Sequence, residues 1–242
     1  FRSHLGSVVA LEGELSAENI GRQRKFGPLM FLYDFFQDRF VRPRLHLADP
    51  AHHRELLSRA LTEVILAAPG PAASSAASAG LARLLDIGCG TGAALDLLPP
   101  AVDYTVLDLS YHMLKVAVKR GRRSGLDGPP PRFVQGNSEE LPFDDGSFEA
   151  VLIDTSTHMI PKWKKALDEA ARVLVRSGSL VCSAPTVGIL PEFDAKWSEI
   201  SGPRHLNSLT EQDLAKASLA SGLRYTMRGI NGAVLYFSAV KE

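Results

Sequence analysis

Cysteine is scarce in this chain, with two residues among 242, Cys89 and Cys182. Two cysteines this far apart, each in an apolar or glycine-rich stretch, exclude a disulfide framework. No cluster of histidine, cysteine and acidic residues has the spacing of a metal site. Unpaired buried thiols are typical of a reducing compartment, so we expect an intracellular protein of the cytoplasm or the mitochondrial matrix.

An excess of charge of either sign is also missing, because 27 Lys and Arg residues balance 27 Asp and Glu residues. A bulk electrostatic attraction to nucleic acid or to an anionic membrane is therefore not implied. Residues 39–44 and 115–123 are nevertheless locally basic. These stretches fit an ordinary loop and a solvated helix face, or else a patch that binds an anion or RNA.

Long apolar runs are absent too, since none reaches the roughly 18 residues that a membrane-spanning helix needs. The chain starts at Phe1, and its first residues, FRSHLGSVVAL, contain arginine and serine but no acid. This composition weakly resembles the end of a mitochondrial presequence.

Changes in composition divide the chain into an N-terminal layer and a core. Apolar residues from Leu56 to Ile65 recur at helical spacing, and a low-complexity stretch of alanine, serine, glycine and proline follows them. We expect a helical extension that serves as a lid at residues 1–68, a flexible linker at 69–80, and a core at 81–242. A lid insertion at about 184–209 is expected to consist mostly of loop.

Strand-like and helix-like runs alternate through the core. Such alternation is typical of a Rossmann-like α/β fold, a mostly parallel sheet with helices on both faces. We expect one helix directly after the glycine-rich turn and others after Ser110 and Thr210, which can cap helix N-termini. Asn231-Gly232 indicates a terminal hairpin with an antiparallel strand. The expected strands lie in ARLLDIG, DYTVLDLS, PRFVQGN, SFEAVLID, GSLVCSAP and the two halves of LRYTMRGINGAVLYFSAVKE.

The glycine-rich turn LLDIGCGTGAAL is expected at the carboxyl end of the first core strand, where open parallel sheets bind ligands. Gly88, Gly90 and Ala93 satisfy the dinucleotide pattern G-x-G-x-x-G/A, and Asp108 follows at the distance of a ribose-binding acid. Asp86, just before the glycines, would repel a pyrophosphate but attract the cationic methionine end of S-adenosylmethionine. The turn therefore favours S-adenosylmethionine, with a nicotinamide enzyme as the alternative.

Four stretches in the same order carry a resemblance to a known family. They are LLDIGCGTGAALDLLP, VLDLSYHMLKVA, GNSEELPFDDGSFEAVLI and ALDEAARVLVRSGSLVCSAP. Together they resemble the class I S-adenosylmethionine-dependent methyltransferases, in the branch of ubiquinone-biosynthesis and other small-molecule enzymes. The resemblance implies a seven-stranded sheet with an antiparallel last strand.

The resemblance also implies roles for individual residues. The glycine turn would hold the methionine end of the cofactor, Asp108 its ribose hydroxyls and Leu109 its adenine. Asn137 replaces an acid that in the family bonds the adenine amino group, and its amide oxygen can still accept that bond. The residues expected to bind S-adenosylmethionine are Asp86, Gly88, Cys89, Gly90, Gly92, Asp108, Leu109, Asn137, Ser138 and Tyr33.

Asp154 and His158 are the candidate catalytic residues, because both follow the strand expected at SFEAVLID. His158 matches a histidine frequent in the family and can act as a base, or it orders the loop and packs below the cofactor. Asp154 can polarise an acceptor amine or hydroxyl, or it caps a helix. His52 and His53 are expected on an exposed helix surface. Aromatics in the lid insertion, such as Trp197, suit either an apolar acceptor or ordinary packing.

The sequence thus predicts a methyltransferase that acts on a small-molecule acceptor. A second hypothesis is a methyltransferase-like scaffold or assembly factor of a larger complex, such as a mitochondrial ribonucleoprotein, and an RNA methyltransferase lies between the two. A nicotinamide oxidoreductase is a third. Neither the acceptor, nor the atom methylated, nor the oligomeric state follows from the sequence.

Overall fold

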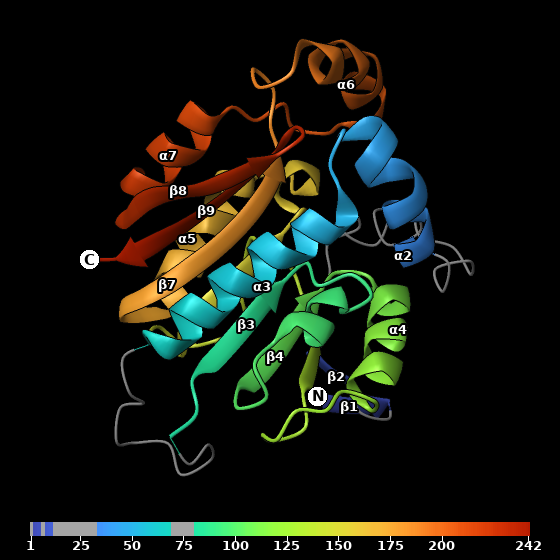
Figure 1. The fold of residues 1–242 in the computed structure, drawn as a ribbon. Helices are drawn as coiled ribbons and strands as arrows, with labels where there is room; N and C mark the ends of the chain where they lie inside the picture. Colours follow the sequence, from blue (N-terminus) through green and yellow to red (C-terminus); the bar gives the residue numbers. More distant parts are fainter. Residues whose placement is uncertain (1, 6–7, 12–32, 69–79) are drawn as a thin grey trace.

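The computed structural model describes residues 2–5, 8–11, 33–68 and 80–242. A single twisted sheet runs through the molecule, with helices on both of its faces (Figure 1). The predicted linker at 69–80 lies outside the described residues except for Gly80. In the described part of the chain, no helix is long and apolar enough to cross a membrane.

Seven strands form the core of the sheet in the order β5-β4-β3-β6-β7-β9-β8. The five from β5 to β7 are parallel, whereas β9 is antiparallel to both of its neighbours. This confirms the predicted seven-stranded sheet with an antiparallel last strand. The strands are β3 (Arg83–Ile87), β4 (Asp103–Asp108), β5 (Arg132–Gln135), β6 (Phe148–Asp154), β7 (Leu174–Pro185), β8 (Leu223–Asn231) and β9 (Val234–Lys241).

Two further strands, β1 (Arg2–Leu5) and β2 (Val8–Leu11), lie within the extension that was predicted to be helical. They pair antiparallel with each other, and β2 adds in parallel to β5. Without them β5 would be an edge strand with unpaired backbone groups, which explains why this segment is extended. The remainder of the described extension is helical, with α2 (Tyr33–Phe36), the π-helical η2 (Gln37–Leu45) and α3 (Pro50–Leu66).

The helices of the core follow the predicted caps. Ser110 accepts a hydrogen bond from Met113 N at the start of α4 (Tyr111–Gly121). Thr210 and Asp213 form a complete capping box at the start of α7 (Glu211–Ala220). Three further helices of the core are η4 (Thr157–Met159), α5 (Trp163–Val173) and α6 (Pro191–Arg204).

Two expectations about helices were wrong. The glycine turn leads into η3 (Ala93–Leu97), a short 3-10 helix, because Pro99 and Pro100 follow and stop the segment from extending. The lid insertion, expected to be mostly loop, contains the fourteen-residue helix α6. Its sequence lacks a long apolar stripe, since Phe193 and Trp197 are its two buried apolar side chains.

The N-terminal layer is fixed to the turn between β8 and β9. Asn231 accepts from Asp49 N at 2.9 Å and donates to Asp49 O at 2.7 Å, while Ala233 N donates to His46 O at 2.8 Å. Gly232 adopts a φ of 60°, and a Cβ at this position would overlap the carbonyl group of Leu47. This close contact holds α3 across the face of the sheet and directs its first turn toward the carboxyl end of β6.

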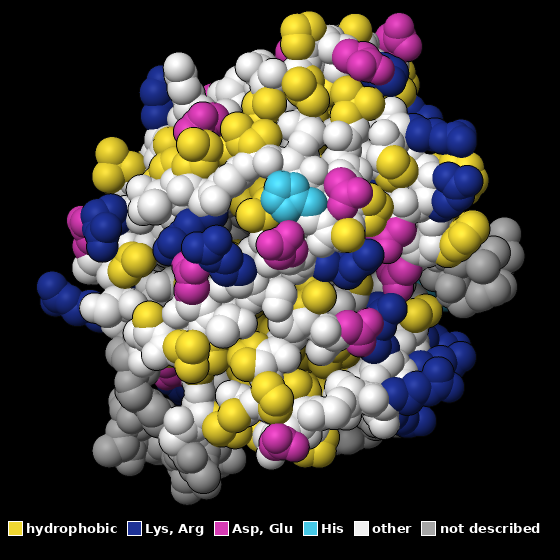
Figure 2. All heavy atoms as spheres, in the orientation of Figure 1, with side chains coloured by type: hydrophobic (Ala, Val, Ile, Leu, Met, Phe, Trp, Pro, Cys, Tyr) yellow, Lys and Arg dark blue, Asp and Glu magenta, His cyan; other side chains and the backbone are white. Residues whose placement is uncertain are grey.

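Charges of both signs are interspersed over the face that Figure 2 shows, and Lys and Arg side chains gather beside α4. The basic stretch 115–123 forms the exposed side of this helix, where Lys115 and Lys119 face solvent. Arg120 instead turns inward and pairs with Asp34 at 2.7 Å. The stretch is thus mainly a solvated helix face.

Candidate functional site

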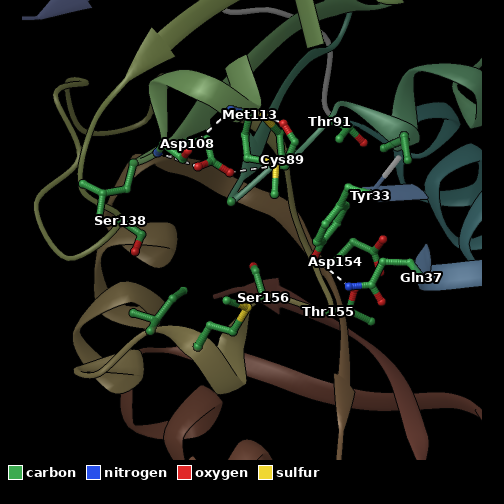
Figure 3. Close-up of a pocket in the computed structure, with 18 of the residues that line it drawn as sticks. Tyr33, Gln37, Cys89, Thr91, Asp108, Met113, Ser138, Asp154, Thr155 and Ser156 are labelled. Atoms are coloured by element: carbon green, nitrogen blue, oxygen red, sulfur yellow. Dashed lines mark hydrogen bonds between the residues drawn. The ribbon is translucent and has the colours of Figure 1, made fainter. Parts of the chain in front are cut away.

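A cavity of about 1220 Å³ opens at the carboxyl ends of β3, β4 and β6. The glycine turn and the end of β4 form one side of it, and the N-terminal layer forms another. Figure 3 shows Asp108 and Cys89 on the first side, with Tyr33, Gln37 and Asp154 together on the other. The position agrees with the rule that parallel sheets bind ligands where their strands end.

The glycines of the turn have distinct roles. All three have positive φ, 71° at Gly88, 55° at Gly90 and 74° at Gly92. A Cβ at Gly88 would lie 2.7 Å from Ser156 Oγ, and one at Gly92 would lie 3.1 Å from the Cβ of Ala117. Gly90 faces open space and lines the cavity. Gly88 and Gly92 therefore allow tight packing of the turn, whereas Gly90 leaves room for a ligand next to the backbone.

Asp108 is held in place by the turn that it faces. Its two carboxylate oxygens accept hydrogen bonds from Gly90 N at 2.8 Å and from Ser110 N at 2.7 Å. Burial raises the pKa of Asp108 to about 6, although these two bonds counteract part of the effect. Each oxygen keeps a further lone pair, so the fixed carboxylate can accept two hydroxyl donors from a ligand in the cavity.

Leu109, Asn137 and Ser138 line the cavity next to Asp108, as predicted. The amide oxygen of Asn137 accepts a hydrogen bond from Glu139 N at 3.0 Å, which fixes the orientation of this side chain. Cys89 also lines the cavity, and burial raises its pKa well above the usual value, so its thiol is protonated and is not a nucleophile.

The sequence analysis expected Asp86 to attract the methionine end of the cofactor. The structure corrects this expectation, because Asp86 does not line the cavity. Its side chain is buried beneath the turn, where Oδ2 accepts a 2.5 Å hydrogen bond from Tyr104. Oδ1 has no hydrogen-bond partner among the described residues. Burial raises the pKa of Asp86 to about 7. A carboxyl group buried in this position does not contact a ligand in the cavity.

Tyr33, at the start of α2, lines the cavity and belongs to the segment that was predicted to act as a lid. Its hydroxyl group accepts a 2.7 Å hydrogen bond from Gln37 Nε2, and burial raises its pKa. The next residue, Asp34, accepts a 2.5 Å bond from Thr91 of the glycine turn and pairs with Arg120 of α4. The start of this segment is thus connected directly to the glycine turn.

Asp154 lines the cavity at the end of β6, as expected of a catalytic candidate. Ser183 donates a 2.5 Å hydrogen bond to Oδ1, while His53 Nε2 lies 3.5 Å and Arg42 NH2 4.0 Å from Oδ2. Burial alone would raise the pKa of Asp154. The interactions with His53 and Arg42, together with the bond from Ser183, outweigh it and hold the pKa well below its usual range.

His53 is the residue that sequence reasoning missed. It was expected on an exposed helix surface, but it is 4% exposed and lines the cavity. A signal was present, since His53 precedes Leu57, Ala60 and Leu61 at helical spacing and therefore shares their buried face. Its neighbour His52 is exposed, as predicted.

His158 is not placed to act as a base in this cavity. It does not line the cavity, and its ring packs edge-on against Trp197, with ring centres 5.6 Å apart. Burial lowers its pKa to about 4, and its carbonyl group accepts a hydrogen bond from Asn207 N at 2.8 Å. The alternative role, in which His158 orders a loop by packing, agrees with these contacts. Among the described residues no cluster suited to a metal ion occurs.

Comparisons with known proteins agree with this geometry. Residues 85–182 match the model of a methyltransferase domain family. A ubiquinone/menaquinone biosynthesis C-methyltransferase, UbiE, of Sinorhizobium fredii is 34% identical over 149 residues, which are 59% of this chain and 57% of that protein. A phthiotriol/phenolphthiotriol dimycocerosates methyltransferase of Mycobacterium tuberculosis is 34% identical over 156 residues, 63% of this chain and 49% of that protein.

A solved structure extends the likeness to the fold. Geranyl diphosphate C-methyltransferase of Streptomyces coelicolor, in complex with Mg²⁺, geranyl diphosphate and S-adenosyl-L-homocysteine, superposes with a TM-score of 0.56 at 16% identity. The match covers 77% of this chain and 78% of that one. In fold, glycine turn and domain match, this part of the chain resembles the class I S-adenosylmethionine-dependent methyltransferases. The chain spans about half the length of these two curated relatives.

Proposed function

We propose that the chain binds S-adenosylmethionine in the cavity and transfers its methyl group to a small, largely apolar acceptor. The observation that carries the cofactor assignment is the carboxylate of Asp108, fixed by two backbone N–H groups at the edge of the cavity. Its remaining lone pairs suit the two vicinal hydroxyl groups of a ribose. Gly90, Cys89 and Tyr33 would then surround the methionine end, with Leu109, Asn137 and Ser138 around the adenine.

The same residues fit a dinucleotide poorly. Pyrophosphate is bound by the positive end of a helix that follows the glycine turn, but η3 has only five residues and is a 3-10 helix. Asp34 and Asp96 also line the cavity near this turn and share the guanidinium of Arg120, so the summed charge of these three groups stays negative and disfavours phosphate. A methionine carries an ammonium group and, in the cofactor, a sulfonium, so these acids favour it. When bound, S-adenosylmethionine supplies an electrophilic methyl group.

An apolar acceptor is supported by apolar residues that follow β6 and α6 in the chain. Met159, Ile160, Pro161 and Leu206 line the cavity. One of the relatives is named for ubiquinone/menaquinone biosynthesis and the other for phthiotriol/phenolphthiotriol dimycocerosates. These relatives give no support to a nucleic-acid acceptor. Location in the cytoplasm or the mitochondrial matrix, inferred from the unpaired cysteines, is likewise a proposal.

Calorimetric titration with S-adenosylmethionine, S-adenosylhomocysteine and NAD tests the cofactor. We expect both sulfur ligands to bind and NAD not to bind. Binding of NAD alone would overturn the proposal. A coupled assay for S-adenosylhomocysteine formation with prenylated and unprenylated hydroquinones then tests the activity. Tight cofactor binding without turnover of any of these acceptors would favour the scaffold hypothesis.

A further inference from the structure

A buried polar cluster joins the N-terminal layer to the core at the acceptor end of the cavity. His53 of α3 lies at its centre, between Asp154 of β6 and Tyr236 of β9. Nδ1 of His53 is 2.6 Å from the hydroxyl group of Tyr236, and Nε2 is 3.5 Å from Asp154 Oδ2. Tyr236 and His53 are 2% and 4% exposed. The contact with Tyr236 therefore fixes the Nδ1 edge of the His53 ring in the interior of the protein.

The surroundings of His53 provide a partner for each of its protonation states. Arg42 NH2 is 3.1 Å from Nε2, and because a guanidinium only donates, this contact fits an unprotonated Nε2 that accepts a hydrogen bond. When Nε2 carries a proton, that proton faces the carboxylate of Asp154 instead. The charged and titratable groups that face His53 are Arg42 from η2, Asp154 from β6, Tyr236 from β9 and His46 from the segment before α3.

We propose that His53 and Asp154 form a proton-accepting pair for the methyl acceptor, and that the acceptor therefore carries an ionisable hydroxyl group. This inference rests on the function proposed above. A cationic amine is disfavoured at this end because the side chains of Arg42 and Arg54 also line the cavity there. An apolar wall with a single proton-accepting pair is suited to a phenol or a hydroquinone.

The proposed step balances without another reactant. The hydroxyl proton passes to the His53–Asp154 pair, the ionised acceptor forms a bond to the methyl carbon, and the carbon–sulfur bond breaks with its electron pair on sulfur. Asp154 stabilises the imidazolium, and Tyr236 keeps the ring oriented. The pair returns its proton to water after the product leaves.

A coloured phenol tests the pair without turnover. The protein is saturated with S-adenosylhomocysteine and titrated with 4-nitrophenol, whose ionised form absorbs visible light. We expect the wild-type protein to ionise the bound phenol at a pH at least one unit below that of the free compound, about a tenfold change in the equilibrium. His53→Gln should abolish this displacement and leave the affinity for S-adenosylhomocysteine unchanged.

The neighbouring histidine provides the control, because His52 lies on the same helix but is exposed. His52→Gln should behave like the wild type. If His53→Gln does not fold, Tyr236→Phe is the second variant. It keeps the imidazole of His53 but removes the hydroxyl group that contacts Nδ1, and it should reduce the shift in the ionisation pH of the bound phenol. The proposal would be overturned if a folded His53 variant still ionised the bound phenol at the same lowered pH as the wild type. Absent phenol binding while S-adenosylhomocysteine still binds would overturn it too. Loss of that ligand in the wild type would instead refute the cofactor assignment.

Turnover gives a second readout once a phenol is methylated. We expect His53→Gln to lower kcat by about 10²- to 10⁴-fold with acceptors that are un-ionised in solution, and far less with acceptors already ionised. A purely structural role would lower kcat equally for both. Equal losses would therefore contradict the proposed proton transfer.

Discussion

The two ends of the cavity are built in different ways. Apart from Tyr33, the proposed cofactor end comes from one continuous part of the core, between the glycine turn and Ser138, and backbone hydrogen bonds fix its groups. The acceptor end combines residues from distant parts of the chain, since His53 and Tyr236 are 183 positions apart. The first end depends on local sequence, and the second depends on how the N-terminal layer docks on the sheet.

The acids at the two ends also differ in their electrostatics. Burial raises the pKa of Asp86 to about 7 and that of Asp108 to about 6, because no cation pairs with either among the described residues. Asp154 is also mostly buried but has His53 and Arg42 beside it, and its pKa is held below the usual range. An uncompensated carboxylate is suited to receive a cationic or hydroxyl-bearing ligand. A compensated one is suited to stabilise a proton on its neighbour.

Disrupting the docking of the N-terminal layer should have the largest effect. Gly232→Ala forces a Cβ into the backbone of Leu47 at a positive φ, so we expect it to lower the free energy of unfolding by about 2–4 kcal/mol. Urea unfolding measures this loss. Gly188→Ala is the matched control, because Gly188 has a φ of 87° but open space around it. Equal losses in the two variants would show that docking at Gly232 is not tight.

The buried acid of the cofactor end should make stability depend on pH. Because the pKa of Asp86 is raised on folding from 3.8 to about 7, its contribution is complete below about pH 4 and is lost as the pH rises toward 7. Asp86→Asn cannot ionise. As the pH rises from 4.5 to 7.5, the wild type should therefore lose on the order of 2–4 kcal/mol of unfolding free energy relative to this variant. Parallel pH profiles from urea unfolding would contradict the assigned burial.

Weakening the link between the predicted lid and the glycine turn should have the smallest effect. Arg120 is a quarter exposed and pairs with Asp34, so Arg120→Ala should cost about 0.5–1 kcal/mol of binding energy for S-adenosylhomocysteine. The loss should diminish in high salt, where the wild-type ion pair is itself screened. Lys119→Ala, at an exposed position of the same helix, is the control for calorimetry. A loss that is independent of salt would argue against an ion pair.

Sequence alone predicted the seven core strands, the helix caps at Ser110 and Thr210, and the placement of Asp108 beside the glycine turn. Each of these depends on neighbours within a few residues or on the edge that parallel strands share. The prediction from sequence failed where the position of a side chain or the conformation of a segment depended on residues distant in the chain. The hydrogen bond from Tyr104 that keeps Asp86 away from the cavity comes from the next strand, and the strand pairing of β2 with β5 joins segments over 120 positions apart.

The candidate proton-accepting histidine was missed for the same reason. His158 lies beside the right strand in sequence, but the rings of Trp197 and His46 enclose it. His53 lies far away in sequence, and only the phase of α3 shows that it faces inward. The helical periodicity that predicted the core residues of α3 could also have identified this buried histidine.

Calorimetry of S-adenosylhomocysteine binding to Asp108→Asn and His53→Gln, side by side, tests the division of the cavity most directly. Asp108→Asn should lose about 1–3 kcal/mol, roughly 5- to 150-fold in Kd, because a charge-assisted acceptor of hydroxyl groups is lost. His53→Gln should bind with the affinity of the wild type. Unchanged binding by the Asp108 variant, or an equal loss in both variants, would contradict separate cofactor and acceptor ends.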